Sequence, residues 1–412
     1  MLSFFHKSIL TLVTGFTLAL VLGMAASTAF AQSPPRVSLL TFQPGSVYWQ
    51  RFGHNAILVK QNGKETVYNY GIFDFNQDNF MLNFAAGRMQ YRLAAEPLRQ
   101  ALYPYHVEGR WALEQQLALT PEKATELADF LAWNAQPENA EYRYDYFIAN
   151  CSTKVRDVLN EALSGHLQDQ LEDQPGSLSY RDQVARVSAP DIALMLGMDI
   201  GLGTPADQSI NLWEESFIPS VLMRAIRDVK RADGTPLVSS EQLLLKGRLP
   251  EEPAEPPQLW PLFLAIGLGL AALVLVLGKA RRYLAARISL SVFAGAFTLV
   301  FGLGGLVLAA LWGLTEHWGT YRNQNLLLVN PVYILLLPLW LTAVRRAWRP
   351  SGFARWLLRL IVAGATIAGL LHLVPGLAQD NLAWVALLLP LHLSLLWLVE
   401  RAVASPQDTQ TT

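Results

Sequence analysis

The sequence predicts an α+β domain outside a membrane, followed by an all-α transmembrane bundle of about five spans. Apolar residues make up 52% of the 412-residue chain. They concentrate at the N-terminus and after Trp260, a distribution typical of membrane proteins. The region between is mixed in polarity and begins with short β-branched or aromatic runs, which predict strands. The net charge of −1 offers no basic excess for binding nucleic acid.

Shifts in composition divide the chain into five parts. We expect a signal peptide at 1–31, an exported domain at 32–247, a Pro-rich linker at 248–258, a five-span membrane domain at 259–400 and a cytoplasmic tail at 401–412. The signal peptide is indicated by Lys7, by a long apolar run, and by Ala29 and Ala31 at the two positions that a signal peptidase reads. An uncleaved N-terminal anchor is the alternative.

Basic residues predict how the spans are oriented. The apolar spans cover roughly 259–278, 288–314, 326–344, 357–376 and 382–400, and each is near the ~20 residues that cross a bilayer. Arginines gather between spans one and two, between spans three and four, and after span five. The positive-inside rule places these segments in the cytoplasm. The domain and the loops at 315–325 and 379–381 then share the periplasmic side of a bacterial inner membrane.

Local patterns predict the elements of the exported domain. Runs at 37–42, 55–60, 65–73 and 111–119 are typical of strands. Thr120-Pro121-Glu122 has the composition of a helix start, and a second helix is predicted from Cys151 to Gly165. Further helices are expected around 188–197 and 212–230.

Cys151 is the only cysteine, so it cannot form an internal disulfide. A helix N-terminus carries unpaired N–H groups and about half a positive charge, which favour a thiolate. We therefore expect Cys151 to have a lowered thiol pKa, with nearby N–H groups as an oxyanion site. The alternative is a buried, inert small hydrophobe.

His54 is the best candidate for a base. It opens a predicted strand that ends before Asn62-Gly63, a strong two-residue hairpin signal. With that turn, Gln61 pairs with Lys64, and the residue numbers of each opposed pair sum to 125. Asn69 then lies diagonal to His54 on the same face. Asn69 would then orient the imidazole, giving a nucleophile–base–orienter set. A longer turn would bring in Tyr70 or Asp74 instead.

Three short motifs carry a family resemblance: Phe52-Gly53-His54-Asn55, Tyr68-Asn69-Tyr70-Gly71, and Asn150-Cys151-Ser152-Thr153 with Arg156-Asp157. Together they resemble the Lnb-type N-terminal periplasmic domain family. That resemblance implies a permuted papain-like fold, similar to lecithin–retinol acyltransferases, in which His precedes Cys. It also implies apolipoprotein N-acyltransferase activity. His317-Trp318-Gly319 and the run from Asn323 to Pro331 are similar to the family's outer loop and third span.

The predicted function is thiol-dependent acyl transfer. A lipid acyl group would pass through a Cys151 thioester to an amine such as a lipoprotein N-terminus. The expected partners are membrane lipid and lipoprotein, and neither cofactor nor metal is expected. The alternatives are an exported cysteine peptidase or amidase and a membrane-anchored binding domain. Besides Cys151, His54 and Asn69, we expect substrate contacts from Asn150, Ser152, Arg88, Tyr91, Glu316 and His317.

Overall fold

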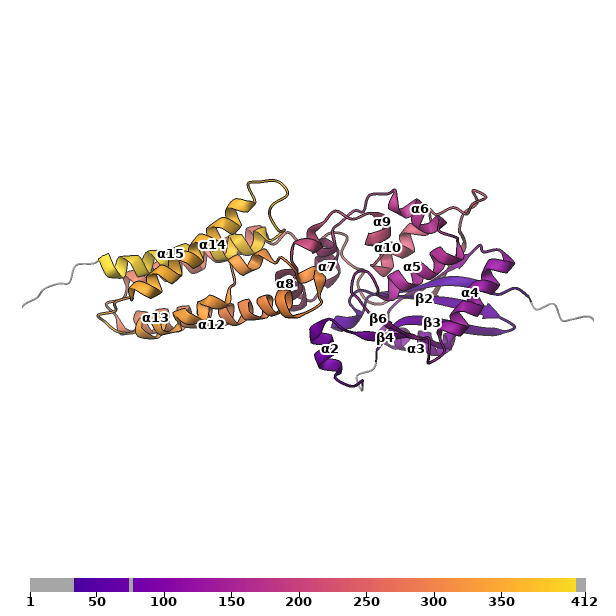
Figure 1. Cartoon of the computed structure of the whole chain (residues 1–412), viewed down its shortest axis with the longest axis horizontal. Helices are drawn as coiled ribbons and strands as arrows, with labels where there is room; N and C mark the ends of the chain where they lie inside the picture. Colours follow the sequence, from indigo (N-terminus) through magenta and orange to yellow (C-terminus); the bar gives the residue numbers. More distant parts are fainter. Residues whose placement is uncertain (1–32, 74–76, 405–412) are drawn as a thin grey trace, which may run out of the picture.

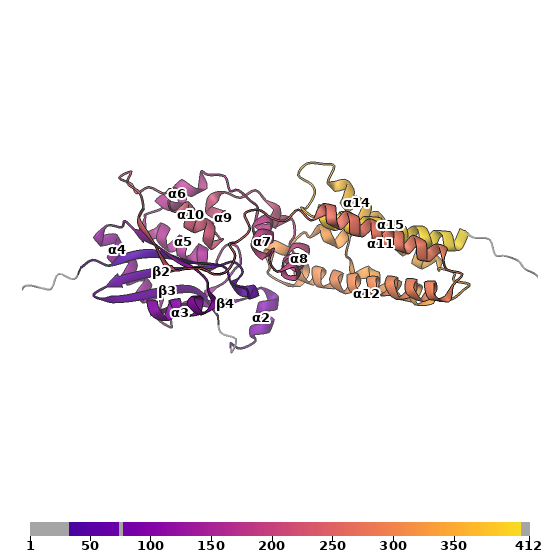
Figure 2. The ribbon, with the colours of Figure 1, turned by 180° about the vertical axis from the view of Figure 1, so that it is seen from behind.

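The computed structural model describes residues 33–73 and 77–404. An α/β domain forms one end of an elongated molecule, and a bundle of long helices forms the other (Figure 1). The view from behind shows that the two parts meet around α7 and α8 (Figure 2). The predicted signal peptide and residues 405–412 of the predicted tail lie outside the described residues.

A seven-stranded antiparallel sheet organises the domain, with strand order β6-β4-β3-β2-β1-β5-β7. The strands are β1 (Arg36–Phe42), β2 (His54–Gln61), β3 (Lys64–Ile72), β4 (Gln90–Pro97), β5 (Ala112–Leu117), β6 (Glu141–Arg143) and β7 (Val238–Leu245). The four strands predicted from composition are β1, β2, β3 and β5. The remaining three have few adjacent β-branched residues, so their composition did not predict strands.

The predicted hairpin is confirmed. Gln61 pairs with Lys64 and Ile57 with Tyr68, so opposed numbers sum to 125. Asn62 and Gly63 both have positive φ, at 53° and 75°, as a type I′ turn requires. This turn fixes which side chains of β2 and β3 share a face.

Helices cover both faces of the sheet. The helix α5 (Cys151–Ala162) packs against one face through Val155 and Leu159, in a core that includes Ile57 and Tyr70. The helix α3 (Leu98–Glu108) covers the opposite face. The remaining helices of the domain are α2 (Phe80–Ala86), α4 (Pro121–Asn134), α6 (His166–Glu172), α7 (Tyr180–Ser188), α8 (Ile192–Gly201), α9 (Leu212–Glu215) and α10 (Pro219–Ala225), with short 3₁₀ turns at η1 (Tyr48–Gln50) and η2 (Thr204–Asp207).

Most of the predicted helices begin near the residues where the sequence placed them. The Thr120 side chain accepts a hydrogen bond from the backbone N–H of Lys123, and Pro121 opens α4. The helix α5 starts at Cys151 as predicted and ends at Ala162, a turn before Gly165. The helix expected at 188–197 is shifted to 192–201, because Asp191 caps a later start. The helix expected at 212–230 starts at Leu212 after its Asn211 cap but is divided into the two short helices α9 and α10.

Five apolar segments long enough to cross a membrane follow the domain, as predicted. They are α11 (Trp260–Lys279), α12 (Leu284–Leu314), a segment over Trp318–Thr342, α14 (Gly352–Leu371) and α15 (Leu382–Ala404).

The third apolar segment is a broken helix. It consists of η3 (Trp318–Thr320), η4 (Gln324–Leu327), η5 (Pro331–Leu336) and α13 (Leu337–Thr342). Pro331 and Pro338 lack the N–H that a regular helix uses. Irregular backbone at membrane depth needs surrounding protein, and Leu328, Val329 and Tyr333 are buried in the bundle core.

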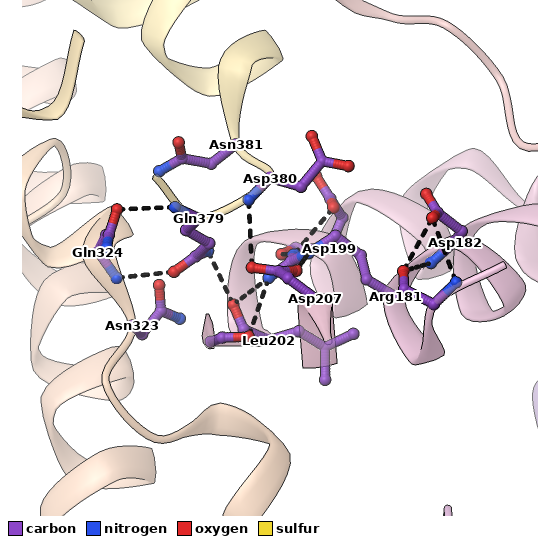
Figure 3. A network of polar contacts seen from close by, with 12 residues as sticks. Arg181, Asp182, Asp199, Leu202, Asp207, Asn323, Gln324, Gln379, Asp380 and Asn381 are labelled. Carbon is purple, nitrogen blue, oxygen red and sulfur yellow. Dashed lines mark hydrogen bonds and ion pairs between the residues drawn. The ribbon is translucent and has the colours of Figure 1, made fainter. Parts of the chain in front are cut away.

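Polar contacts, some of them buried, join the domain to the bundle. Arg181, at the start of α7, pairs with Asp199 of α8 and Asp207 of η2. Asp207 Oδ2 accepts a hydrogen bond from the backbone N–H of Asp380 at 3.1 Å. Gln379 Nε2 donates to the Leu202 carbonyl at 3.0 Å. Figure 3 shows how these groups link the loop before α15 to the exported domain.

The Pro-rich segment after Arg248 is bound to the domain. Gln43 Nε2 donates to the carbonyls of Leu249 and Pro250, and Arg186 pairs with Glu252 at 3.1 Å. The composition predicted a Pro-rich linker at 248–258. It has no regular secondary structure, but these contacts hold it along the domain surface.

Candidate active site

Cys151 is the first residue of α5, and Asn150 caps that helix. Asn150 Oδ1 accepts hydrogen bonds from the N–H groups of Ser152 and Thr153, at 2.8 and 2.9 Å. Thr153 Oγ1 in turn accepts from the Asn150 N–H at 2.8 Å, which completes a capping box. Asn150 Nδ2 donates to the carbonyls of Tyr146 and Phe217. These bonds hold the cysteine in one position.

Gly71 lets the cysteine approach the sheet closely. Its φ is +89°, a conformation that favours glycine. A Cβ built at this position would lie 3.2 Å from Cys151 Cβ. The Cys151 thiol interacts with the backbone N–H groups of Asn55, Ser152 and Cys151 itself. Because Asn55 directly follows His54, the sulfur lies beside the first residues of β2.

His54 belongs to a hydrogen-bonded series on β2, β3 and β4. Its Nε2 lies 3.1 Å from Asn69 Oδ1, and Asn69 Nδ2 donates to Glu96 Oε1 at 2.8 Å. Because the Asn69 amide nitrogen donates to Glu96, its oxygen must accept from His54. The proton of the neutral imidazole is therefore on Nε2, and Nδ1 has the free lone pair.

The structure distinguishes among the expected orienting residues. The turn at Asn62-Gly63 places Asn69 within reach of His54, as the register predicted. Tyr70 lies on the other face of β3, where its hydroxyl donates to Asn134 Oδ1 at 2.6 Å. Asp74 lies outside the described residues.

Burial makes the resting pair neutral. It raises the pKa of the Cys151 thiol to about 11, although the nearby N–H groups act in the opposite direction. Burial also lowers the pKa of His54 to about 4, with the Asn69 hydrogen bond opposing it and Arg110 lowering it further. The expected lowered thiol pKa was wrong, because desolvation of the thiolate outweighs the helix terminus.

The pKa values predict slow alkylation of the resting thiol at neutral pH. Cys151 keeps part of its surface accessible to a reagent. In the full-length protein, its iodoacetamide rate should keep rising toward a pH of about 11. In the denatured chain the same thiol should titrate near ~8.5. A native rate that is already fast and constant below pH 7 would contradict this result, because it requires a preformed thiolate–imidazolium pair.

The predicted substrate residues separate into three environments. Asn150 and Ser152 are buried, and the Ser152 hydroxyl donates to Asn55 Oδ1 or the Ser216 carbonyl. Both side chains form hydrogen bonds within the protein that position α5, and their contact with substrate stays a prediction. Tyr91 is buried on β4 and stacks on Tyr144 at 4.2 Å.

Arg88, Glu316 and His317 meet where the domain contacts the outer loop of the bundle. Arg88 Nε lies 2.6 Å from Glu316 Oε1, and Arg143 pairs with the same carboxylate. These arginines lower the pKa of Glu316. His317 Nε2 lies 3.2 Å from the Phe84 carbonyl, and its ring stacks on Tyr146.

This outer loop also contacts the segment that leads to Cys151. Trp318 Nε1 donates to Asp145 Oδ2 at 2.8 Å, and the Trp318 ring packs against Phe147. The Asp145 carboxylate meanwhile accepts from the N–H groups of Phe147 and Ile148. The candidate nucleophile is therefore connected through a short loop to the periplasmic end of the bundle.

Sequence reasoning missed Glu96, Asn55 and Arg143. Glu96 reaches Asn69 only through the β3–β4 pairing, in which Asn69 lies opposite Ala94. Arg143 meets Glu316 across 173 positions of sequence. No local pattern indicates these pairings. Asn55 is the polar residue next to His54 and opens a buried apolar run. Its hydrogen bond with Ser152 depends on where α5 packs, which the sequence does not show.

An exported antiparallel-sheet domain joined to five apolar helices defines an inner-membrane protein with a periplasmic domain. The chain matches the Lnb N-terminal periplasmic domain over residues 27–184 and the Lnb transmembrane domain over residues 254–401, in that order. It belongs to the Lnb family. No curated protein and no solved structure matches the chain significantly.

Proposed function

We propose that this chain is a membrane-bound, thiol-dependent acyltransferase with Cys151 as nucleophile, His54 as base and Asn69 as the orienting residue. We also propose that the domain is a permuted papain-like fold. The support is the packing of a cysteine-bearing helix on an antiparallel sheet, with the histidine strand earlier in the chain. The observation that carries the function is the His54–Asn69 hydrogen bond beside the thiol.

The first half-reaction forms a thioester. His54 Nδ1 removes the thiol proton, and the sulfur attacks the carbonyl carbon of a lipid ester. The carbonyl oxygen of the ester becomes an oxyanion, which backbone N–H groups near Cys151 stabilise. The intermediate then collapses as the C–O bond breaks. The departing alkoxide takes the proton from the imidazolium and leaves as a lysolipid.

The second half-reaction transfers the acyl group to an amine. The amine nitrogen attacks the thioester carbonyl, and His54 removes one of its protons. The C–S bond breaks, and the sulfur leaves as a thiolate that recovers this proton. The products are an amide and the free Cys151 thiol, so neither an oxidant nor a cofactor is consumed.

An experiment with acyl-labelled phospholipid tests these two half-reactions. Proteoliposomes containing the full chain are incubated with acyl-labelled phospholipid, with and without a diacylated lipopeptide that has a free amine. We expect hydroxylamine-sensitive label on Cys151 first and then amide-linked label on the acceptor. Release of free fatty acid alone would identify a hydrolase. Absence of both thioester and product would contradict an enzymatic role and favour a binding domain.

The Asn69–Glu96 pair should act through the histidine. Asn69→Ala removes the group that fixes the imidazole, so we expect kcat to fall by about 10²-fold while KM changes little. Glu96→Gln keeps a hydrogen-bond acceptor and should have a smaller effect than Glu96→Ala. Steady-state kinetics with labelled phospholipid compare the variants, and Glu65→Ala, on the exposed part of β3, is the matched control. If kcat falls equally in Glu96→Gln and Glu96→Ala, then Glu96 does not position Asn69 by accepting its hydrogen bond.

A further inference from the structure

The short helix α2 presents large apolar side chains to the outside of the exported domain. Met81 and Leu82 are 71% and 70% exposed. The opposite side of the helix carries Phe80 and Phe84, whose rings stack at 6.1 Å. Two neighbouring apolar residues exposed to this extent indicate a surface that contacts a partner or a membrane.

Hydrogen bonds fix α2 to the periplasmic end of α12. The Glu316 N–H donates to the Ala86 carbonyl at 2.8 Å, and His317 contacts the Phe84 carbonyl. The 31 residues of α12 span about 46 Å at 1.5 Å per residue, the thickness of a bilayer with its head groups. Its last residue, Leu314, is 81% exposed. The continuity with α12 places α2 at the level of the lipid head groups.

An aromatic series runs from α2 toward the candidate nucleophile. Phe80 stacks on Phe73 at 6.2 Å, Phe73 contacts Tyr91 at 5.2 Å, and Tyr91 stacks on Tyr144. Tyr144 contacts Tyr146 at 5.7 Å, and the Tyr146 carbonyl accepts a hydrogen bond from Asn150 Nδ2 at 2.9 Å. Asn150 directly precedes Cys151 at the start of α5. These aromatic side chains therefore form a continuous path from the exposed helix α2 to the start of α5, where Cys151 lies.

Two cations lie beside this series. Arg88 and Arg143 both pair with Glu316, so the three side chains carry one excess positive charge at the membrane surface. Such a charge attracts the phosphate of a phospholipid. Apolar side chains on a short helix, with excess cationic charge next to it, are the composition of an element that lies in the membrane interface.

We propose that α2 inserts into the outer leaflet of the inner membrane, with Met81 and Leu82 among the acyl chains, and that the aromatic series guides one chain of a bilayer phospholipid toward Cys151. The insertion is supported by the exposed apolar side chains, the excess positive charge and the contacts at the end of α12, and it does not depend on acyl transfer. The guiding role rests on the proposed acyl transfer.

Site-directed spin labelling measures the insertion directly. Leu82→Cys is labelled in a Cys151→Ser background and reconstituted in phospholipid nanodiscs. We expect its oxygen accessibility to exceed its accessibility to a water-soluble nickel complex, as for Val292→Cys on the lipid-facing side of α12. Lys64→Cys, at the tip of the β2–β3 hairpin, should behave as fully aqueous. A label at 82 that matches the label at 64 overturns the proposal, and this readout does not depend on enzyme activity.

A second variant tests lipid delivery with Cys151 intact. Met81→Glu/Leu82→Glu should lower turnover of bilayer phospholipid by about tenfold, because two apolar groups leave the membrane. Its iodoacetamide rate at Cys151 should equal that of the native chain, which shows that the site is folded. Undiminished turnover in this variant overturns the guiding role. If the native chain shows no turnover at all, the proposed function fails while the labelling result stands.

Discussion

Replacing Cys151 by alanine should abolish acyl transfer, with a loss of at least about a thousandfold in kcat, because no other residue supplies the nucleophile. Cys151→Ser should be nearly as inactive, since a hydroxyl is far less acidic than a thiol. Both changes are small in volume, and the Asn150 capping box that holds α5 does not involve the cysteine side chain. The measurement is transfer of labelled acyl groups to a lipopeptide in proteoliposomes.

His54→Ala should cause a loss of similar size, and combining it with Cys151→Ala should add little, because the two groups act in one unit. His106→Ala is the matched control, since His106 is an exposed histidine on α3 of the same domain. A Cys151→Ala variant with full activity would eliminate the thioester mechanism. Thermal unfolding of each variant separates loss of chemistry from loss of fold.

Local chemistry was sufficient to predict the central part of the candidate site. The turn at Asn62-Gly63 requires two residues with positive φ, and it alone determines that His54 and Asn69 share a face of the hairpin. The start of α5 follows from Asn150 and Thr153 in the same way. The arginine asymmetry and the apolar runs predicted the five spans, because bilayer crossing depends on length and composition.

Features that depend on tertiary contacts were not predictable. The third span was expected as one helix, but Pro331 and Pro338 break it, and this is tolerated only because the surrounding bundle buries it. The raised thiol pKa depends on the side chains that desolvate Cys151. Arg88 and Glu316 are 228 positions apart, and nothing in either local sequence indicates that they pair.

Arg181→Met should destabilise the junction between the domain and the bundle by about 3–5 kcal/mol, the usual cost of removing one partner from a buried ion pair. The Arg181 side chain is 3% exposed and pairs with both Asp199 and Asp207. Burial already raises the pKa of Asp207, and Arg181 opposes that increase. Without the guanidinium, two carboxylates remain buried and close together, and neither has another cation among its described ion-pair partners.

These carboxylates also bind the bundle, which extends the effect beyond the exported domain. Asp199 Oδ2 accepts from Trp384 Nε1 at 2.7 Å, and Asp207 Oδ2 accepts from the Asp380 N–H. Arg181→Met should therefore lower the apparent Tm in detergent and make the linker that begins at Arg248 more sensitive to protease. Arg231→Met is the control, because Arg231 pairs with the exposed Asp233 and should cost less than about 1 kcal/mol. Adding Asp199→Asn to Arg181→Met removes one uncompensated charge and should recover part of the loss. If the double variant is no more stable than Arg181→Met, the destabilisation arises from lost packing rather than from the buried charges.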